Sequence, residues 1–367
     1  MSELDTAAEP LLEIKDLHVH FATPAGVAEV VNGVSLRLDA ARMHGLVGES
    51  GSGKSVTARS VLGLLPRGNL LRRDGVVRFG GRDLLGMDEA ALRQEIRGRE
   101  IAMIFQDPMT ALNPVMRIGH QIAMPMRRHL GLSKKAALAK AVELLDQVGI
   151  PNPKARLRSF PHELSGGQRQ RVMIAIALSC DPRLLIADEP TTALDVTVQA
   201  QILDLFDRLR AERGLAILLV SHDLSLIAER CDEVSVMYAG RVVENGPADV
   251  IFADPRHPYT RLLEEARPLL ENEPHTLLKT IPGRPPRLID LPPGCAFQDR
   301  CPNVRDDCAA IRPAQVAVAE GRTVACLHPH EPAALAADPA DDPVGDSAPS
   351  GSGDASDPAP TSRKALA

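Results

Sequence analysis

The sequence of 367 residues predicts an α/β protein with an antiparallel β subdomain, a parallel core sheet, a helical insertion and a small cysteine-rich C-terminal extension. Alternating apolar and polar side chains over 12–21 and 34–38 predict half-buried strands of an antiparallel ribbon. From Gly45, a short apolar strand, a glycine-rich loop and a helix over about 55–65 predict a parallel α/β unit. We also predict a strand over 101–105, and later apolar runs predict core strands buried on both faces at 184–187, 216–220 and 234–237.

Changes of composition divide the chain. Ser133 as a helix cap, an apolar face and Gly149 as a stop predict a helix within a helical insertion. Residues 281–293 are proline-rich and predict an extended connector. The last segment contains no aromatic residue and predicts disorder. We therefore expect a core domain over 11–260, its helical insertion over about 107–165, an extension over 261–330 and a disordered tail over 331–367.

The bulk composition excludes some classes of function. Hydrophobic residues make up 44% and charged residues 25%, as in ordinary globular proteins. A net charge of -6 supplies no basic field for phosphate backbones, so we expect no nucleic-acid partner. No apolar run approaches the roughly 20 residues that span a bilayer, and the acidic first residues do not resemble a secretory signal. We expect a cytosolic chain that reaches a membrane only through partners.

The segment GESGSGKS at 48–55 matches the phosphate-binding loop pattern GxxxxGKS and lies between a predicted strand and helix. Glycines allow backbone N–H groups to point at phosphate oxygens, and the helix N-terminus adds positive potential. Lys54 would neutralise the outer phosphates of ATP, and Ser55 can bind Mg²⁺. The predicted phosphate-binding residues are Gly48, Ser50, Gly51, Ser52, Gly53, Lys54 and Ser55.

Two acids end a predicted buried strand. Asp188 would lie beside the phosphate loop, where Mg²⁺ requires a carboxylate. Glu189 would lie further out, where it can accept a proton from the water that attacks the γ-phosphate, or orient that water. Acids can also simply end a strand, but a preceding phosphate loop favours the catalytic interpretation.

A second glycine-bearing helix start occurs far along the chain, in the sequence LSGGQ. Its hydroxyl and glycine N–H groups can bind another phosphate. One nucleotide does not need two such cradles from one chain, so we infer a dimer in which each second cradle closes over the partner's ATP. The residues concerned are Ser165, Gly166, Gly167 and Gln168.

The combination of LSGGQ, the phosphate loop and the strand-end Asp-Glu pair resembles the ABC transporter ATPase family. The resemblance implies an ABC-type core and further site residues. Phe21 aligns with the aromatic residue that stacks on adenine, and Gln106 with the glutamine that senses Mg²⁺ and the membrane subunit. Asp195 aligns with the D-loop, and His222 with the switch histidine that contacts the γ-phosphate. As alternatives, Phe21 could be a core residue, Gln106 a surface residue and His222 a helix cap.

Several segments resemble the peptide-importer branch of this family, namely those at 48–66, 105–114, 187–201 and 257–260. One departure is Ala41-Arg42, where relatives place Gly-Glu in the turn before the phosphate-loop strand. The resemblance implies two integral membrane permease subunits, a second ATPase subunit in a heterodimer, an extracytoplasmic peptide-binding protein and a peripheral position at the cytoplasmic face of the membrane. An importer of nickel or another small solute is the nearer alternative, and a non-transport ABC ATPase the more distant one.

Four cysteines lie close together in the sequence with the spacing C-x5-C-x6-C-x17-C, at Cys295, Cys301, Cys308 and Cys326. In a reducing compartment such a cluster favours a metal over disulfides. Four thiolates suit tetrahedral Zn²⁺ or an iron–sulfur cluster, and spacing does not choose between them. The resemblance to peptide-importer ATPases implies a [4Fe–4S] cluster with a structural or regulatory role.

Overall fold

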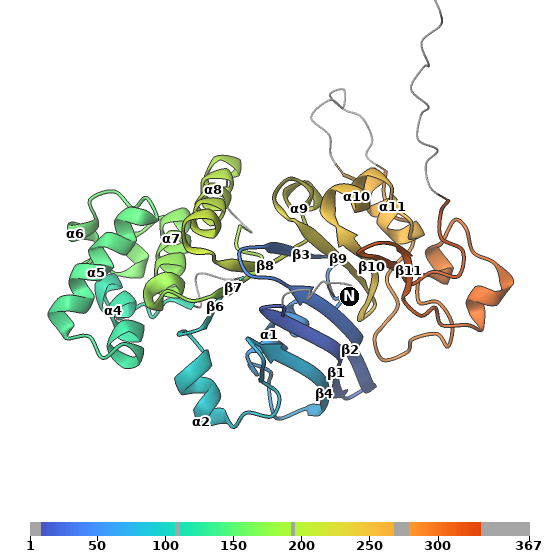
Figure 1. Ribbon diagram of the computed structural model, residues 1–367, viewed down its shortest axis with the longest axis horizontal. Coiled ribbons are helices and arrows are strands. Elements are labelled where there is room, and N and C mark those ends of the chain that lie inside the picture. The colour runs from blue at the N-terminus through green and yellow to red at the C-terminus, as the bar shows by residue number, and fades with distance from the viewer. Residues whose placement is uncertain (1–8, 107–110, 192–194, 268–278, 332–367) are drawn as a thin grey trace, which may run out of the picture. The chain divides into compact units, whose positions relative to one another are not determined.

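The computed structural model describes residues 9–106, 111–191, 195–267 and 279–331. These residues belong to one compact unit. Two β-sheets and a group of helices make up this unit (Figure 1). The predicted disordered tail lies outside the described residues, apart from Glu331.

A four-stranded antiparallel sheet forms the predicted β subdomain. Its order is β2-β1-β4-β5, with β1 at Leu12–Thr23, β2 at Gly26–Leu38, β4 at Leu70–Phe79 and β5 at Arg82–Asp83. The second strand begins earlier than predicted because a tight turn joins it to β1. Thr23 Oγ1 donates to the Gly26 carbonyl at 2.8 Å and holds this turn.

An eight-stranded sheet forms the core, in the order β11-β12-β10-β9-β3-β8-β7-β6. Strands β6, β7, β8, β3 and β9 are parallel, as the fully apolar runs predicted. Strands β10, β12 and β11 continue the sheet with antiparallel pairing, and β11 and β12 come from the C-terminal extension. The bounds are β3 Met43–Val47, β6 Ile101–Ile104, β7 Leu184–Asp188, β8 Ala216–Ser221, β9 Glu233–Tyr238, β10 Arg241–Pro247, β11 Val316–Ala319 and β12 Arg322–Val324.

The parallel direction brings four chemically important segments to one edge of the core sheet. The phosphate loop follows β3, Gln106 follows β6, Glu189 follows β7 and His222 follows β8. Because the carboxyl ends of parallel strands share an edge, residues far apart in sequence become neighbours there.

A group of helices lies beyond β6, at the left of Figure 1, with α4 and α5 packed against each other and against α7. Ser133 caps α5 as predicted, because its Oγ accepts from the Ala136 N–H at 3.2 Å, and Gly149 has a φ of 72°. The bounds are α4 Ile118–His129, α5 Lys134–Gln147, α6 Pro153–Arg156 and α7 Gly166–Ala177.

Helix α1, Lys54–Val61, is shorter than the predicted 55–65. Gly63 takes a φ of 63°, and Arg97 Nε donates to the Leu62 carbonyl at 2.7 Å, so the chain turns there. The other α-helices of the described residues are α2 Glu89–Ala91, α8 Val196–Arg213, α9 Leu224–Arg230, α10 Ala248–Ala253 and α11 Pro258–Glu265.

Other expectations concern the turns and connectors. Ala41, in the turn before β3, has a φ of 59°, a left-handed value that favours glycine. The predicted connector at 281–293 contains neither helix nor strand. Among the residues described, every helix is too short or too polar to traverse a lipid bilayer.

Candidate functional site

The phosphate loop has a backbone that only glycine allows. Gly48, Gly51 and Gly53 have φ values of 146°, 80° and 102°. A Cβ on Gly48 would lie 2.1 Å from the Met237 carbonyl oxygen, and one on Gly53 would lie 2.4 Å from that of Val30. These glycines therefore let the loop pack directly against neighbouring strands, with its N–H groups at the start of α1.

Lys54 lies buried within this loop, with 5% of its surface exposed. Its Nζ donates to the carbonyl oxygens of Gly48 at 2.7 Å and Glu49 at 3.0 Å. Burial lowers the pKa of Lys54, and the negative charges of Glu189 and Asp188 oppose that shift. The ammonium therefore lies between the loop and the acidic end of β7.

Ser55 and Asp188, the predicted Mg²⁺ ligands, meet directly. Ser55 Oγ donates to Asp188 Oδ1 at 2.8 Å. Asp188 is fully buried, and burial raises its pKa, while the hydrogen bond from Ser55 and the charge of Arg59 lower it. Arg59 Nη2 lies 3.4 Å from Asp188 Oδ2. Sequence reasoning missed Arg59, although it lies four residues after Ser55 on the same face of α1.

Glu189 is the meeting point of three strand ends. Gln106 Nε2 donates to its Oε2 at 2.8 Å, and His222 Nδ1 lies 3.3 Å from its Oε1. Glu189 has a φ of 49°, a conformation that costs energy in a non-glycine residue, and its N–H donates to the Val220 carbonyl. The structure thus brings the three predicted catalytic residues together.

The LSGGQ segment forms a capped helix start. Ser165 Oγ accepts from the Gln168 N–H at 3.3 Å, and Gln168 Oε1 accepts from the Ser165 N–H at 3.2 Å. Gly166 and Gly167 form the first turn of α7, and the space around Gly166 is open. Gln170, which sequence reasoning missed, is buried and donates to the Pro190 carbonyl at 2.5 Å, so α7 is tied to the segment after Glu189.

The remaining predicted residues have structural surroundings of their own. Asp195 is exposed and caps α8, where its Oδ1 accepts from the Val198 N–H at 2.9 Å. Ser50 lies in the phosphate loop and Ser52 is buried there. Phe21 is only 9% exposed and packs in the hydrophobic cluster of the β subdomain. This burial favours the core alternative, and adenine stacking by Phe21 stays a prediction.

All four clustered cysteines line one small cavity. The Cys295 N–H donates to the Cys308 carbonyl at 2.8 Å, which joins the first and third cysteine segments. A Cβ on Gly294 would lie 2.2 Å from the Cys308 carbonyl oxygen, so only glycine allows this approach. Cys326 follows β12 and reaches the same cavity.

The chemistry of this cavity fits a thiophilic metal centre. Burial raises the pKa of Cys295, Cys301 and Cys326, that of Cys326 to about 11, and the neighbouring thiols add to this shift. A metal would therefore displace protons from these thiols on binding. His328 lines this cavity, and its Nε2 lies 2.8 Å from Asp307 Oδ1. With the Cys308 thiol these two side chains offer three donor atoms within 4.8 Å of one another.

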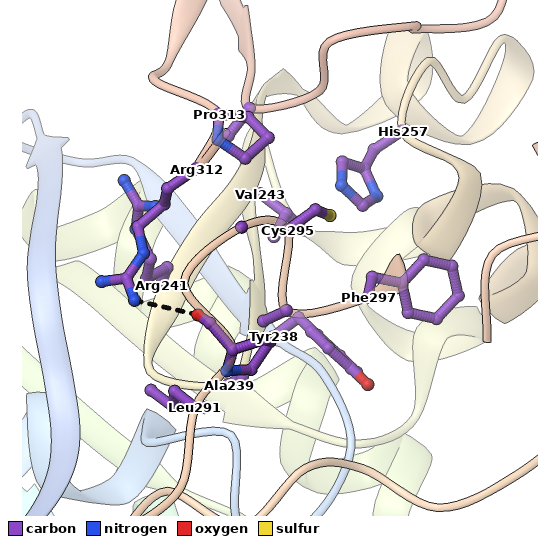
Figure 2. A pocket seen from close by; sticks show the side chains of 14 residues that line it. Tyr238, Ala239, Arg241, Val243, His257, Leu291, Cys295, Phe297, Arg312 and Pro313 are labelled. Carbon is purple, nitrogen blue, oxygen red and sulfur yellow. Dashed lines mark hydrogen bonds between the residues drawn. The ribbon is translucent and has the colours of Figure 1, made fainter. Parts of the chain in front are cut away.

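Aromatic side chains attach the cysteine segment to the core. Figure 2 shows Cys295 on the side of His257 and Phe297, away from the guanidinium groups of Arg241 and Arg312. The Phe297 ring lies 5.2 Å from that of Tyr238. His257 caps α11, since its Nδ1 accepts from the Tyr259 N–H at 3.0 Å.

Comparisons with known proteins agree with this geometry. A family profile described as "ABC transporter" matches residues 31–192, and one described as "Oligopeptide/dipeptide transporter, C-terminal region" matches 243–308. The chain is 49% identical to the oligopeptide transport ATP-binding protein OppD of Salmonella typhimurium, over 88% of this chain and 95% of that relative. It is 46% identical to the dipeptide transport ATP-binding protein DppD of Bacillus subtilis, over 87% and 94%.

Solved structures match the fold. A dimeric structure of MJ0796, a bacterial ABC transporter cassette, has a TM-score of 0.57 and 25% identity, covering 65% of this chain and 98% of that one. A post-hydrolysis dimer of the same cassette bound to ADP and Pi has a TM-score of 0.58 at 24% identity. The chain therefore belongs to the ABC transporter family, among the ATP-binding proteins of oligopeptide and dipeptide transporters.

Proposed function

We propose that this chain binds ATP with Mg²⁺ and hydrolyses it to drive the import of oligopeptides or dipeptides across the cytoplasmic membrane. One observation carries the proposal: the acidic end of β7 contacts the phosphate-loop helix through Ser55 and contacts Gln106 and His222 through Glu189. The residues proposed to bind phosphate, to hold magnesium and to activate water are therefore adjacent.

Each residue has a proposed role in hydrolysis. The loop N–H groups and Lys54 bind the phosphates, and Ser55, Asp188 and Gln106 are the proposed magnesium ligands, directly or through water. Glu189 accepts a proton from the attacking water as the bond between the β-oxygen and the γ-phosphoryl group breaks. His222, which lies beside Glu189, would contact the γ-phosphate.

The second half of each pocket is proposed to come from another ATPase subunit. The LSGGQ segment of one subunit would close over the nucleotide of the other through Ser165, Gly166, Gly167 and Gln168. Asp195 would lie at the boundary between the subunits. The exposed start of α7 supports this role, because Ser165 and Gly166 are exposed there and the first N–H groups of a helix have no partner within the helix. The dimeric cassette structures among the similar proteins support it as well.

The proposed partners are two membrane permeases, a second ABC ATPase and an extracytoplasmic peptide-binding protein, with this chain at the cytoplasmic face. The names of the relatives support this assignment, as does the match of 243–308 to the oligopeptide/dipeptide transporter C-terminal region. We also propose the domain division of 11–260 and 261–330. Transport of nickel or another small solute is the competing function.

A [4Fe–4S] cluster is proposed to be held by Cys295, Cys301, Cys308 and Cys326, and it would cross-link the extension. Their shared cavity and four-sulfur donor set support this proposal. The nearby nitrogen and oxygen donors of His328 and Asp307 keep Zn²⁺ as the alternative. Anaerobically prepared protein should be coloured and contain about four irons per chain; a colourless protein loaded with zinc would reject the cluster.

The transport proposal is tested on the assembled complex with permeases and binding protein in lipid. We expect oligopeptide or dipeptide to raise ATP turnover, and nickel to leave it unchanged. Stimulation by nickel but not by peptide would replace the proposed substrate.

A further inference from the structure

Glu49 of the phosphate loop forms a two-point ion pair with the C-terminal extension. Arg300 Nη1 donates to Glu49 Oε2 at 2.8 Å, and Arg300 Nη2 donates to Glu49 Oε1 at 2.8 Å. The two residues are 251 positions apart in sequence. Paired hydrogen bonds of this kind fix both the distance and the orientation of a carboxylate.

Arg300 is held rigidly on its own side of the contact. It is only 7% exposed, its Nε donates to the Pro282 carbonyl at 2.7 Å, and its Nη1 donates to the Tyr238 hydroxyl at 3.2 Å. Its guanidinium carbon lies 5.8 Å from the ring centroids of both Tyr238 and Phe297. The extension therefore presents a fixed guanidinium to the loop.

The backbone of Glu49 is also held in place, by a residue of α11. Its N–H donates to the hydroxyl of Tyr259, a fully buried residue of α11, at 2.9 Å. On the opposite side, the Glu49 carbonyl accepts from Lys54 Nζ at 3.0 Å. Glu49 thus connects the extension to Lys54, the proposed phosphate-binding lysine.

The position of Arg300 depends on the cysteine segment. It directly precedes Cys301, and its N–H donates to the Phe297 carbonyl at 3.0 Å. The Cys301 N–H donates to the Gln298 carbonyl at 3.3 Å in the same turn. Cys295 and Cys301, at the two ends of this turn, both line the four-cysteine cavity, so the turn that carries Arg300 is part of the wall of that cavity.

We propose that Arg300 is a positioning residue for the phosphate loop, and that through its pair with Glu49 the ordered cysteine segment raises the affinity of the loop for nucleotide. This inference rests on the proposed ATP site. It assigns the extension a regulatory effect on nucleotide binding in addition to a stabilising one.

The central test is a double-mutant cycle in the full chain, with Arg300→Met, Glu49→Gln and the double variant. Arg287→Met is the matched control, because Arg287 pairs with Asp290 at 3.4 Å on the surface of the same segment. Calorimetry measures the Kd for ATP with magnesium, and thermal unfolding measures stability. We expect each single variant to bind ATP about tenfold more weakly, the double variant no more weakly than either, and the control to be unchanged.

A second experiment tests the contribution of the cysteine segment with Cys326→Ser, a substitution outside the turn that carries Arg300. It should weaken ATP binding when Arg300 is present and add nothing in the Arg300→Met background. An equal loss in both backgrounds would reject the route through Arg300. If Arg300→Met does not fold, Glu49→Gln still tests the pair. This substitution replaces one carboxylate oxygen by an amide nitrogen, and it lies in the phosphate loop rather than in the extension.

Two results separate failure of this inference from failure of the ATP site. ATP affinities within twofold of the unsubstituted chain, with a lower Tm, would make the ion pair purely structural and overturn the inference. Absence of ATP binding in the unsubstituted chain itself would overturn the proposed function.

Discussion

Replacing Glu189 by glutamine separates nucleotide binding from hydrolysis. In the structure Glu189 contacts Gln106 Nε2 at 2.8 Å and His222 Nδ1 at 3.3 Å. A glutamine amide can preserve both contacts, since its oxygen accepts from Gln106 and its NH₂ donates to His222. The fold and the magnesium pair of Ser55 and Asp188 are untouched, so ATP binding should stay within about twofold of normal.

The expected loss falls on the chemical step. A positioned general base contributes about 10²- to 10⁴-fold, so kcat should fall by that factor, or about 3–5 kcal/mol in activation free energy. Phosphate release is measured at saturating Mg-ATP in the assembled transporter, and Kd by calorimetry. Glu229→Gln, an exposed glutamate on α9, is the control. A kcat within threefold of normal for Glu189→Gln would remove Glu189 from the base role.

Four further substitutions test the backbone and the buried histidine. Gly53→Ala places a Cβ 2.4 Å from the Val30 carbonyl oxygen and should lower the free energy of unfolding by more than about 2 kcal/mol. Gly51→Ala places its Cβ in open space and should lower it by only about 1–2 kcal/mol, as thermal unfolding will measure. Ala41→Gly relieves a φ of 59° and should raise the free energy of unfolding by about 0.5–1 kcal/mol; a lower Tm would contradict this. Burial lowers the pKa of His257 to about 3, so the folded state disfavours the protonated ring that the unfolded chain carries below about pH 6.5. Stability is therefore retained above that pH and should fall by up to about 1.4 kcal/mol per pH unit toward pH 3, a loss that His257→Asn should reduce in urea titrations.

The sequence was enough to locate the segments that meet at the end of the core sheet, because each of them is local. A glycine loop, a strand-end carboxylate pair and a capped helix start are each recognisable from a few consecutive residues. Parallel strand order then brings Gln106, Glu189 and His222 together without further information. Arg59 and Gln170 were harder to predict, because their roles depend on how α1 and α7 pack.

The extension was predicted less completely, because its contacts are long-range. The cysteine spacing indicated a metal centre. The strands β11 and β12 have only four and three residues, too few to show the alternation of apolar and polar side chains that predicts a strand, so their place in the core sheet was not predicted. The pairing of Arg300 with Glu49 joins residues of two distant motifs and has no local signature. For Phe21 the family resemblance suggested a contact with adenine; its ring is 9% exposed, and that contact stays a prediction.

The hairpin of β11 and β12 covers the edge of β10 and leaves the short strand β11 at the end of the core sheet instead. Glu244 and Asn245 of β10 pair with Val324 and Thr323, so backbone groups that would otherwise be open are satisfied within the chain. A shortened chain ending near residue 260 would expose this edge and leave the buried carboxylate of Glu244 without Arg322, 2.8 Å away. Such a fragment would tend to aggregate through β10 even with its nucleotide motifs intact.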